Sequence, residues 1–196
     1  MRYFSTFHED KDILKAFSDI FLKGSWFEAD ITYSKGIFYK EICKPKEMYD
    51  LIPTSDEVIQ QDSRLLDKMQ DNSYKSIVFD PPFLFRNRKS DNNDKISKRF
   101  SYFKSYDELI EMYKDSLQAV IRKLSRGGYL FFKCQDMTDG NFYCTHYDII
   151  KIATAIGFRL VDIGIKISKS KLQRDAKQQN CLAKTHCYWL VFKKHN

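Results

Sequence analysis

The chain has 196 residues, a net charge of +7, and a composition that is 43% hydrophobic and 15% aromatic. This length suits one domain with its own core, and the composition argues against intrinsic disorder. No apolar run is long enough to cross a bilayer, and the mixed charges of residues 1–12 argue against a signal peptide.

The five cysteines, at positions 43, 134, 144, 181 and 187, include no Cys-x-x-Cys pair. An odd number of scattered cysteines suits reduced thiols better than a disulfide framework or a zinc site. We therefore expect a cytoplasmic protein that carries no metal.

The first third of the chain has the pattern of an α/β fold. Apolar residues recur at helical spacing over residues 10–23, and Gly24 follows as a stop. Residues 26–33 then predict a strand, which leads into the turn Ser34-Lys35-Gly36. A strand followed by a small-residue turn is where a doubly wound fold first meets a nucleotide-like ligand.

Two further acidic residues follow short candidate strands. Asp50 lies beside a turn proline in the segment 44–53, and Asp62 ends a strand predicted over residues 57–62. A carboxylate can accept from two vicinal hydroxyls at once, whereas an aspartate at this place can also cap a helix, here one predicted over residues 64–70. Both interpretations of Asp62 stay open.

The central element is the apolar run 76–79, which predicts a buried strand ending at Asp80. Pro81 and Pro82 lack a backbone N–H and cannot continue a central strand. The carboxylate of Asp80 therefore lies at the carboxyl end of a strand, beside the ring of Phe83. Ligands of open α/β sheets bind at such ends.

The second half predicts alternating helices and strands. The capping box at 105–108 begins a helix that Gly127-Gly128 ends, and a buried strand covers residues 129–136. Residues 145–148 cap another helix, which Gly157 ends. The last two strands are predicted over residues 158–168 and 186–193.

Two basic segments flank the proposed site. Residues 86–104 hold seven Lys or Arg against two Asp, and residues 166–184 hold six against one. The first is a long polar stretch with interleaved aromatics, so we expect a mobile basic loop at about 84–104 and a basic hairpin loop at about 168–185. Such loops suit a phosphate backbone and unstacked bases, although a solvated basic surface is the simpler alternative.

The four residues Asp80-Pro81-Pro82-Phe83 resemble the catalytic [Asn/Asp/Ser]-Pro-Pro-[Tyr/Phe/Trp] motif of class I amino-methyltransferases, which use S-adenosyl-L-methionine. The Asp form is best known in adenine-specific DNA methyltransferases. The resemblance implies that Asp80 and the carbonyl of Pro81 accept the hydrogens of a target amine, while Pro82 fixes the turn and Phe83 stacks on the base.

Residues 30–39 resemble the cofactor-binding motif of a group of small bacterial and phage DNA methyltransferases. The wider family has Asp-x-Phe-x-Gly-x-Gly, whereas only one glycine remains here and Ser34 stands in for another. Asp50 then matches the acid that holds the ribose hydroxyls, and Asp62 the acid that meets the adenine of the cofactor. The implied cofactor-binding residues are Asp30, Thr32, Tyr33, Ser34, Gly36, Asp50 and Asp62.

Residues 133–136 and 185–189 resemble further segments of the same group, the second of which borders the target-base pocket. With the basic loop, they give the candidate substrate-binding residues Arg86, Arg88, Lys89, Lys133, His186 and Tyr188.

The resemblance implies one methyltransferase domain over residues 1–196. Its fold is expected to be Rossmann-like, a seven-stranded mixed sheet, mostly parallel with an antiparallel last strand and with helices on both faces. The implied reaction is methyl transfer to an exocyclic amine of a nucleic-acid base, with adenine N6 in DNA favoured. An RNA base amine remains an alternative substrate, and a non-catalytic nucleic-acid-binding subunit is an alternative function. Specificity is expected to be loose or supplied by a protein partner, and the oligomeric state stays open.

Overall fold

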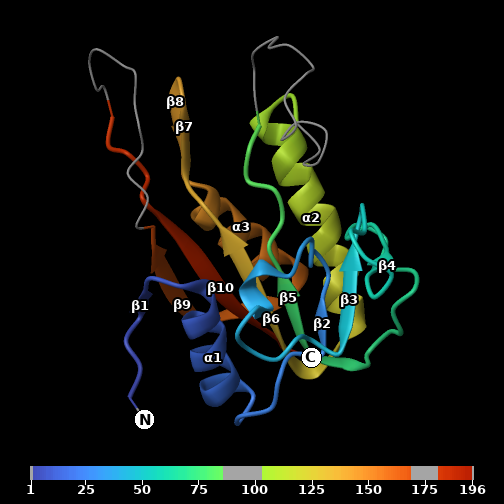
Figure 1. Ribbon diagram of the computed structural model, residues 1–196. Helices are drawn as coiled ribbons and strands as arrows, with labels where there is room; N and C mark the ends of the chain where they lie inside the picture. The colour runs from blue at the N-terminus through green and yellow to red at the C-terminus, as the bar shows by residue number, and fades with distance from the viewer. Residues whose placement is uncertain (1, 86–102, 169–180, 196) are drawn as a thin grey trace.

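The structure is a computed structural model that describes residues 2–85, 103–168 and 181–195 (Figure 1). Its first half contains β1 (Thr6–Phe7), α1 (Asp10–Phe21), β2 (Ala29–Asp30), the short 3-10 helix η1 (Ile37–Tyr39), β3 (Glu47–Asp50), β4 (Ile59–Gln60) and β5 (Tyr74–Phe79). Its second half contains α2 (Tyr106–Lys123), β6 (Leu124–Cys134), β7 (Met137–Asp139), β8 (Asn141–Tyr143), α3 (Thr145–Ile156), β9 (Phe158–Ile167) and β10 (His186–Lys194).

The main sheet has eight strands in the order β1-β9-β10-β6-β5-β2-β3-β4. Strands β2 to β6 are parallel, and β10 lies antiparallel between β6 and β9. The mixed sheet with an antiparallel last strand is therefore confirmed, whereas the expected count of seven strands is wrong. The additional strand is β1, which pairs with β9 through only two residues, too few to give a period in the sequence.

Helices cover both faces of the sheet, as expected. Residues Ile77, Phe79 and Leu130 pack in a core with α2 and α3, whereas Val78 and Phe131 pack in a second core with α1. This alternation follows from the period of two along a strand, which sends successive side chains to opposite faces. In Figure 1, α1 lies on one side of the sheet and α2 and α3 on the other.

Three local predictions are wrong. The strand predicted over 26–33 contains only β2. The helix predicted over 64–70 is absent, because Leu66 has a left-handed φ of 49° and the amides of Leu65 and Leu66 both donate to the carbonyl of Asp62 in a turn. Gly127 and Gly128 do not end α2, which stops at Lys123 where the chain turns extended into β6.

Two predicted helix ends are confirmed, whereas the cap predicted at residues 145–148 is wrong, because α3 has Cys144 at its N-cap without a side-chain cap bond. The hydroxyl of Ser105 accepts from the amide of Glu108 at 3.2 Å at the start of α2, and α3 ends at Gly157 with φ of 116°. Most of each expected basic loop, residues 86–102 and 169–180, lies outside the described residues. Among the described residues, no helix combines the length and the apolar character that a membrane span requires.

Candidate active site

A cavity of about 480 Å³ lies beyond the carboxyl ends of β2, β3, β4 and β5. It is lined by residues from all four strand ends, including Thr32, Asp50, Asp62 and Asp80. Segments far apart in the sequence meet here because parallel strands end at the same edge of a sheet. The volume is in the range of pockets that bind cofactors and other small molecules.

The Asp80-Pro81-Pro82-Phe83 turn lines this cavity and is fixed at both ends. The amide of Asp80 donates to the hydroxyl of Thr32 at 2.7 Å, and the hydroxyl of Tyr113 donates to the carbonyl of Pro82 at 2.7 Å. The proline rings fix two further φ angles. The strand end therefore holds the Asp80 carboxylate and the Phe83 ring in a rigid frame.

The two carboxylate oxygens of Asp80 differ in environment. Oδ2 lies 3.6 Å from Nζ of Lys133. Oδ1 is buried and has no hydrogen-bond partner among the described residues. An unpaired buried acceptor costs free energy, so it marks a place where a ligand donor would bind favourably.

The pKa of Asp80 is raised to about 6, because burial and the nearby charge of Asp10 together outweigh the opposing charges of Lys133 and Lys166. The carboxyl group can therefore be ionised near neutral pH while remaining a better proton acceptor than an exposed aspartate. A side chain with a shifted pKa that lines a cavity is a candidate for a functional role.

The first turn of the fold places its small residues as the sequence suggested. Ser34 has a φ of 54° and Gly36 a φ of 61°, so both adopt the left-handed conformation that glycine favours. A side-chain carbon added at Gly36 would collide with the ring of Tyr33, which stacks on Tyr39 with 5.4 Å between ring centroids. Ser34 thus does take a glycine-like conformation in this turn.

Asp30 lies beneath this turn and not in the cavity lining. Its side chain is buried, accepting from the amide of Thr32 and the hydroxyl of Tyr39, each at 2.8 Å. Burial raises the pKa of Asp30 to about 7. The carboxyl group therefore supports Thr32 and Tyr39, which carry the turn and the anchor of Asp80.

Asp50, at the end of β3, and Asp62, which follows β4, also line the cavity. The carboxylate of Asp50 accepts from the amides of Ser34 and Ile52, both at 2.8 Å, and so joins the end of β3 to the first turn. Asp62 caps no helix; its carboxylate instead accepts from the guanidinium of Arg64, with the shortest contact 2.6 Å. That ion pair lowers the pKa of Asp62.

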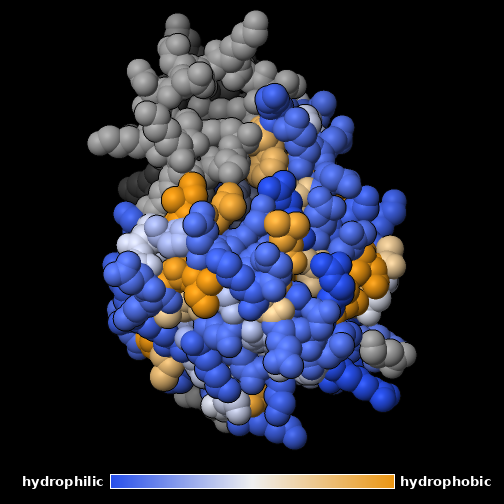
Figure 2. Space-filling view, turned by 90° about the vertical axis from the view of Figure 1, so that its right-hand side faces the viewer, coloured by the Kyte–Doolittle hydropathy of each residue, from blue (hydrophilic) through white to orange (hydrophobic). Residues whose placement is uncertain are grey.

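Large apolar side chains around this cavity were missed by the sequence analysis. Ile37, Leu51, Ile52 and Leu84 line it although each is more than 40% exposed. Figure 2 shows small apolar patches on the mostly hydrophilic face that carries the β4 edge of the sheet. The sequence signal for these apolar residues was the pair Leu51-Ile52, which directly follows Asp50 and belongs to no helical or strand period. An apolar rim of this kind suits a flat ring.

The predicted substrate-binding residues lie in three different places. Lys133 lines the cavity, but its side chain is buried between Asp10 and Asp80. His186 and Tyr188 lie outside the cavity lining, where the ring nitrogen Nε2 of His186 is 3.0 Å from the hydroxyl of Tyr188. Arg86, Arg88 and Lys89 lie outside the described residues.

Comparisons of sequence give no family. The chain matches no protein-family model and none of the curated proteins searched.

Comparisons of structure do find similar proteins, and the three described below are each less than 20% identical to this chain. One is a Thermus thermophilus protein in complex with S-adenosyl-L-methionine, provisionally assigned as a DNA modification methylase, with 18% identity and a TM-score of 0.50 over 69% of this chain. Our chain spans only 51% of that protein.

Two further neighbours are methyltransferases. The cytosine-N4-specific DNA methyltransferase PvuII is 18% identical, with a TM-score of 0.51 over 68% of this chain and 47% of its own. The N-methyltransferase NodS of Bradyrhizobium japonicum WM9, in complex with S-adenosyl-L-homocysteine, is 13% identical, with a TM-score of 0.53 over 94% of this chain and 86% of its own. The chain therefore has the Rossmann-like α/β fold of S-adenosylmethionine-dependent methyltransferases.

Proposed function

We propose that this protein is an S-adenosylmethionine-dependent methyltransferase that modifies an exocyclic amine of a nucleic-acid base, with adenine N6 in DNA as the first candidate. The observation that carries the proposal is the buried Oδ1 of Asp80, an acceptor without a partner among the described residues, held beside Phe83 in the main cavity. The methyltransferase fold of the chain and its resemblance to amino-methyltransferases support the proposal.

The cavity matches the proposed cofactor in size, and its carboxylates offer hydrogen-bond acceptors to that cofactor. Asp50 keeps lone pairs beyond its two backbone bonds and can accept from ribose hydroxyls, while Asp62 can accept from an adenine amine. Ile37, Leu51 and Ile52 offer apolar surface to a base. The left-handed turn at Ser34 and Gly36 lets the backbone approach a ligand closely. When bound, the cofactor supplies an electrophilic methyl group.

The residues at the β5 end position and activate the amine. An exocyclic amine is a poor nucleophile because its lone pair is delocalised into the ring. In our proposal Oδ1 of Asp80 accepts one amine hydrogen and the carbonyl of Pro81 accepts the other. These bonds favour a tetrahedral nitrogen and stabilise its developing positive charge. Phe83 stacks on the base, and a base in a duplex must first be flipped out.

Proton transfer makes a modest demand on Asp80. The methylated nitrogen carries a positive charge until it loses a proton, and a carboxylate within hydrogen-bond reach can receive that proton. A pKa of about 6 keeps Asp80 largely ionised at neutral pH and ready to accept it. Asp80 therefore contributes mainly by positioning the target amine.

Cytosine N4 in DNA is a second candidate target. The similarity to the cytosine-N4-specific enzyme PvuII favours it, because both bases present a conjugated exocyclic amine to the same acceptors. An RNA base amine is a further substrate to test.

The test is transfer of labelled methyl groups from S-adenosylmethionine to separate DNA, RNA and protein pools, followed by nucleoside analysis. We expect label in DNA as N6-methyladenine, and label as N4-methylcytosine would select the second candidate. Asp80→Ala is the inactive control, because it removes both carboxylate acceptor oxygens from the turn. Absence of label in all three pools together with no cofactor binding in calorimetry would refute the proposal.

A further inference from the structure

A chain of four alternating charges runs from the proposed active site to the far side of the β10 strand. Nζ of Lys133 lies 3.6 Å from Oδ2 of Asp80 and 3.2 Å from Oδ1 of Asp10. Nζ of Lys166 lies 2.7 Å from Oδ2 of Asp10. We call the set Asp80–Lys133–Asp10–Lys166 the ion-pair chain.

The inner members of the ion-pair chain are removed from water. The Lys133 and Asp10 side chains are 8% and 10% exposed, and the ammonium group lies 4.4 Å from the ring centroid of Phe38. The indole N–H of Trp189 donates to Oδ1 of Asp10 at 3.0 Å. A buried charge is very costly unless it is paired, so removal of either inner member would leave an uncompensated charge.

The members come from four separate elements. Asp80 follows β5, Lys133 lies in β6, Asp10 begins α1 and Lys166 lies in β9. The position of Asp10 at the N-terminus of α1 also favours its negative charge, because the helix dipole is positive there. The opposed charges outweigh burial and lower the pKa of Asp10, and they raise the pKa of Lys133 despite its burial.

We propose that the ion-pair chain is a positioning device for the proposed methyl transfer, in which Lys133, fixed by Asp10 and Lys166, holds Oδ2 of Asp80 and leaves Oδ1 for the target amine. The inference rests on the proposed function. It assigns Lys133 a role behind the carboxylate instead of a contact with the base, and it adds Asp10 and Lys166 to the site. Neither of these two carries a motif in the sequence.

Other titratable groups act on Asp80 and must be held constant in a test. They are Asp30, Tyr39, Tyr113, Cys134 and Cys187. Substitutions within the ion-pair chain keep all five residues in the protein. Cys187 also responds to the charges of Lys133, Asp10 and Lys166, so its titration is followed beside that of Asp80.

The test is a carboxyl ¹³C NMR titration of Asp80, whose signal is assigned by its loss in Asp80→Asn. Lys133→Met removes the cation beside Oδ2 and should move the Asp80 titration at least about one pH unit upward. Lys166→Met should move it upward by a smaller amount. Lys114→Met is the matched control, since it breaks a surface ion pair with Glu111 on α2 and should leave the titration unchanged.

Turnover gives the second readout. In Lys133→Met, kcat at pH 7 should fall about 100-fold and recover partly at higher pH, with the KM for the cofactor unchanged. Lys133→Arg keeps the charge and should restore most of the wild-type pH profile. A folded Lys133→Met protein with a wild-type titration of Asp80 would overturn the proposal.

Two outcomes separate this inference from the proposed function. If Lys133→Met does not fold, Lys166→Met decides, and an unshifted titration there overturns the inference. If the titrations shift as expected but wild type labels none of the nucleic-acid or protein pools, the proposed function fails and the positioning role fails with it.

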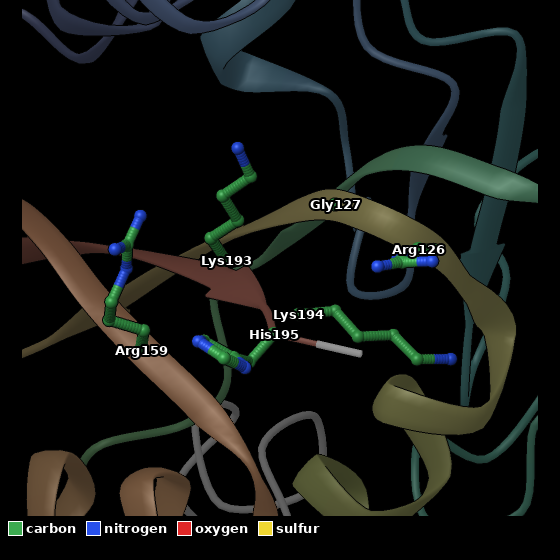
Figure 3. A pocket seen from close by; sticks show the side chains of 6 residues that line it. All are labelled: Arg126, Gly127, Arg159, Lys193, Lys194 and His195. Carbon is green, nitrogen blue, oxygen red and sulfur yellow. The ribbon is translucent and has the colours of Figure 1, made fainter.

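A second, independent observation lies at the other end of the same strands. A hollow of about 270 Å³ is lined by Arg126 and Gly127 of β6, Arg159 of β9, Lys193 and Lys194 of β10, and His195. Figure 3 shows the side chains of Arg159, Lys193 and His195 on one side and that of Arg126 on the other. No acidic residue is among the described residues that line it.

Lys194 differs from the other cations of this hollow. Its Nζ is turned inward to Oδ1 of Asn72 at 2.8 Å and the carbonyl of Leu124 at 2.7 Å. The remaining cations repel one another, and a concave surface of one sign concentrates counter-ions. We infer that Arg126, Arg159, Lys193 and His195 form a binding site for a phosphate-type oxyanion, either a free phosphate compound or a nucleic-acid backbone.

Titration calorimetry at low salt tests this inference with two probes, inorganic pyrophosphate and a single-stranded oligonucleotide. The variant Arg126→Gln/Arg159→Gln/Lys193→Gln should bind at least about 10-fold more weakly. The control Lys15→Gln/Lys75→Gln/Lys151→Gln removes three exposed cations elsewhere and should change affinity less than about threefold.

The two probes distinguish the source of the phosphate. Tight pyrophosphate binding that the oligonucleotide does not displace indicates a small phosphate compound, whereas selective loss of oligonucleotide binding indicates a backbone contact. Equal losses in the two triple variants, or no binding of either probe, would overturn the inference. The Asp80→Asn variant should bind both probes as wild type does, so this site can be tested whether or not the protein transfers methyl groups.

Discussion

Asp50 and Asp80 hold equivalent places in the sheet, one at the end of β3 and the other directly after β5, and both line the main cavity. Their carboxylates are nevertheless used in different ways. Both oxygens of Asp50 accept from backbone amides, whereas Oδ1 of Asp80 is buried without a partner among the described residues. The same residue type at the same edge thus fixes the backbone in one case and keeps an open acceptor in the other.

The difference arises from the residues that come directly after each aspartate. After Asp50 the chain presents the amide of Ile52, whereas Pro81 and Pro82 present no amide after Asp80. The prolines therefore deny the Asp80 carboxylate the local bonds that an aspartate at a turn normally makes. Four predictions test the contrast between the two carboxylates.

The largest effect should come from Asp80→Ala, which removes both carboxylate oxygens. We expect methyl transfer to fall at least about 1,000-fold, because the developing charge on the amine loses its acceptor. Circular dichroism should show an unchanged fold. Asp162→Ala, at an exposed aspartate on β9, is the control, and near-normal turnover in Asp80→Ala would contradict the assignment.

Substitution of the first turn should come next. Gly36→Ala forces a side chain into the Tyr33 ring at a left-handed φ, so we expect a loss of about 1–3 kcal/mol in the free energy of unfolding and weaker cofactor binding.

Ser34→Gly is its matched partner in the same turn. It relieves left-handed strain while adding freedom to the unfolded chain, so stability should change by less than about 1 kcal/mol. Urea unfolding and calorimetry of both variants measure the difference. Equal effects would show that the turn does not depend on these conformations.

The pH dependence of the free energy of unfolding should distinguish Asp80 from an aspartate with an ordinary pKa. Its pKa is about 6 in the folded state against an ordinary value of 3.8, so the folded state retains the proton where the unfolded state has lost it. Wild-type stability should therefore fall as pH rises from about 4 to about 7, and Asp80→Asn should lack that part of the fall.

The expected gain of Asp80→Asn over wild type grows by about 2 kcal/mol across this pH range. Urea unfolding of both proteins at pH 4.5 and pH 7.5 measures it. Burial is the main cause of the raised pKa of Asp30 and is the same in both proteins, so only the smaller effect of the Asp80 charge on Asp30 enters the difference. Parallel pH dependences would show that Asp80 titrates normally.

The smallest effects should come from Asp50→Asn and Asp62→Asn. In Asp50→Asn, an amide keeps one acceptor but turns its NH₂ group toward a backbone N–H, so we expect a loss of about 1 kcal/mol in stability and about fivefold weaker cofactor binding. Asp62→Asn affects one backbone bond, from the amide of Arg64, where Asp50 has two, and breaks a partly exposed ion pair with Arg64, so it should cost less than about 0.5 kcal/mol. A larger stability loss in Asp62→Asn than in Asp50→Asn would reverse the order that the backbone bonds predict.

Elements whose causes are local could be predicted from the sequence. The prolines that stop β5, the capping box of α2 and the apolar periods of α1 and β10 are all read within a few residues. Local rules also produced the wrong helix over 64–70, since no pattern indicates the left-handed φ of Leu66. They missed β1, whose two residues form a strand only because β9 lies beside them.

The grouping of the charges, in contrast, depends on contacts between elements that are distant in the sequence. Asp10 and Lys133 are far apart in the sequence and meet because α1 packs on the face of the sheet to which Lys133 points. The unpaired Oδ1 of Asp80 and the basic hollow likewise depend on which strands are neighbours. Local sequence fixes backbone geometry through nearest-neighbour sterics and hydrogen bonds, whereas the environment of a charge is fixed by the register and packing of elements that are distant along the chain.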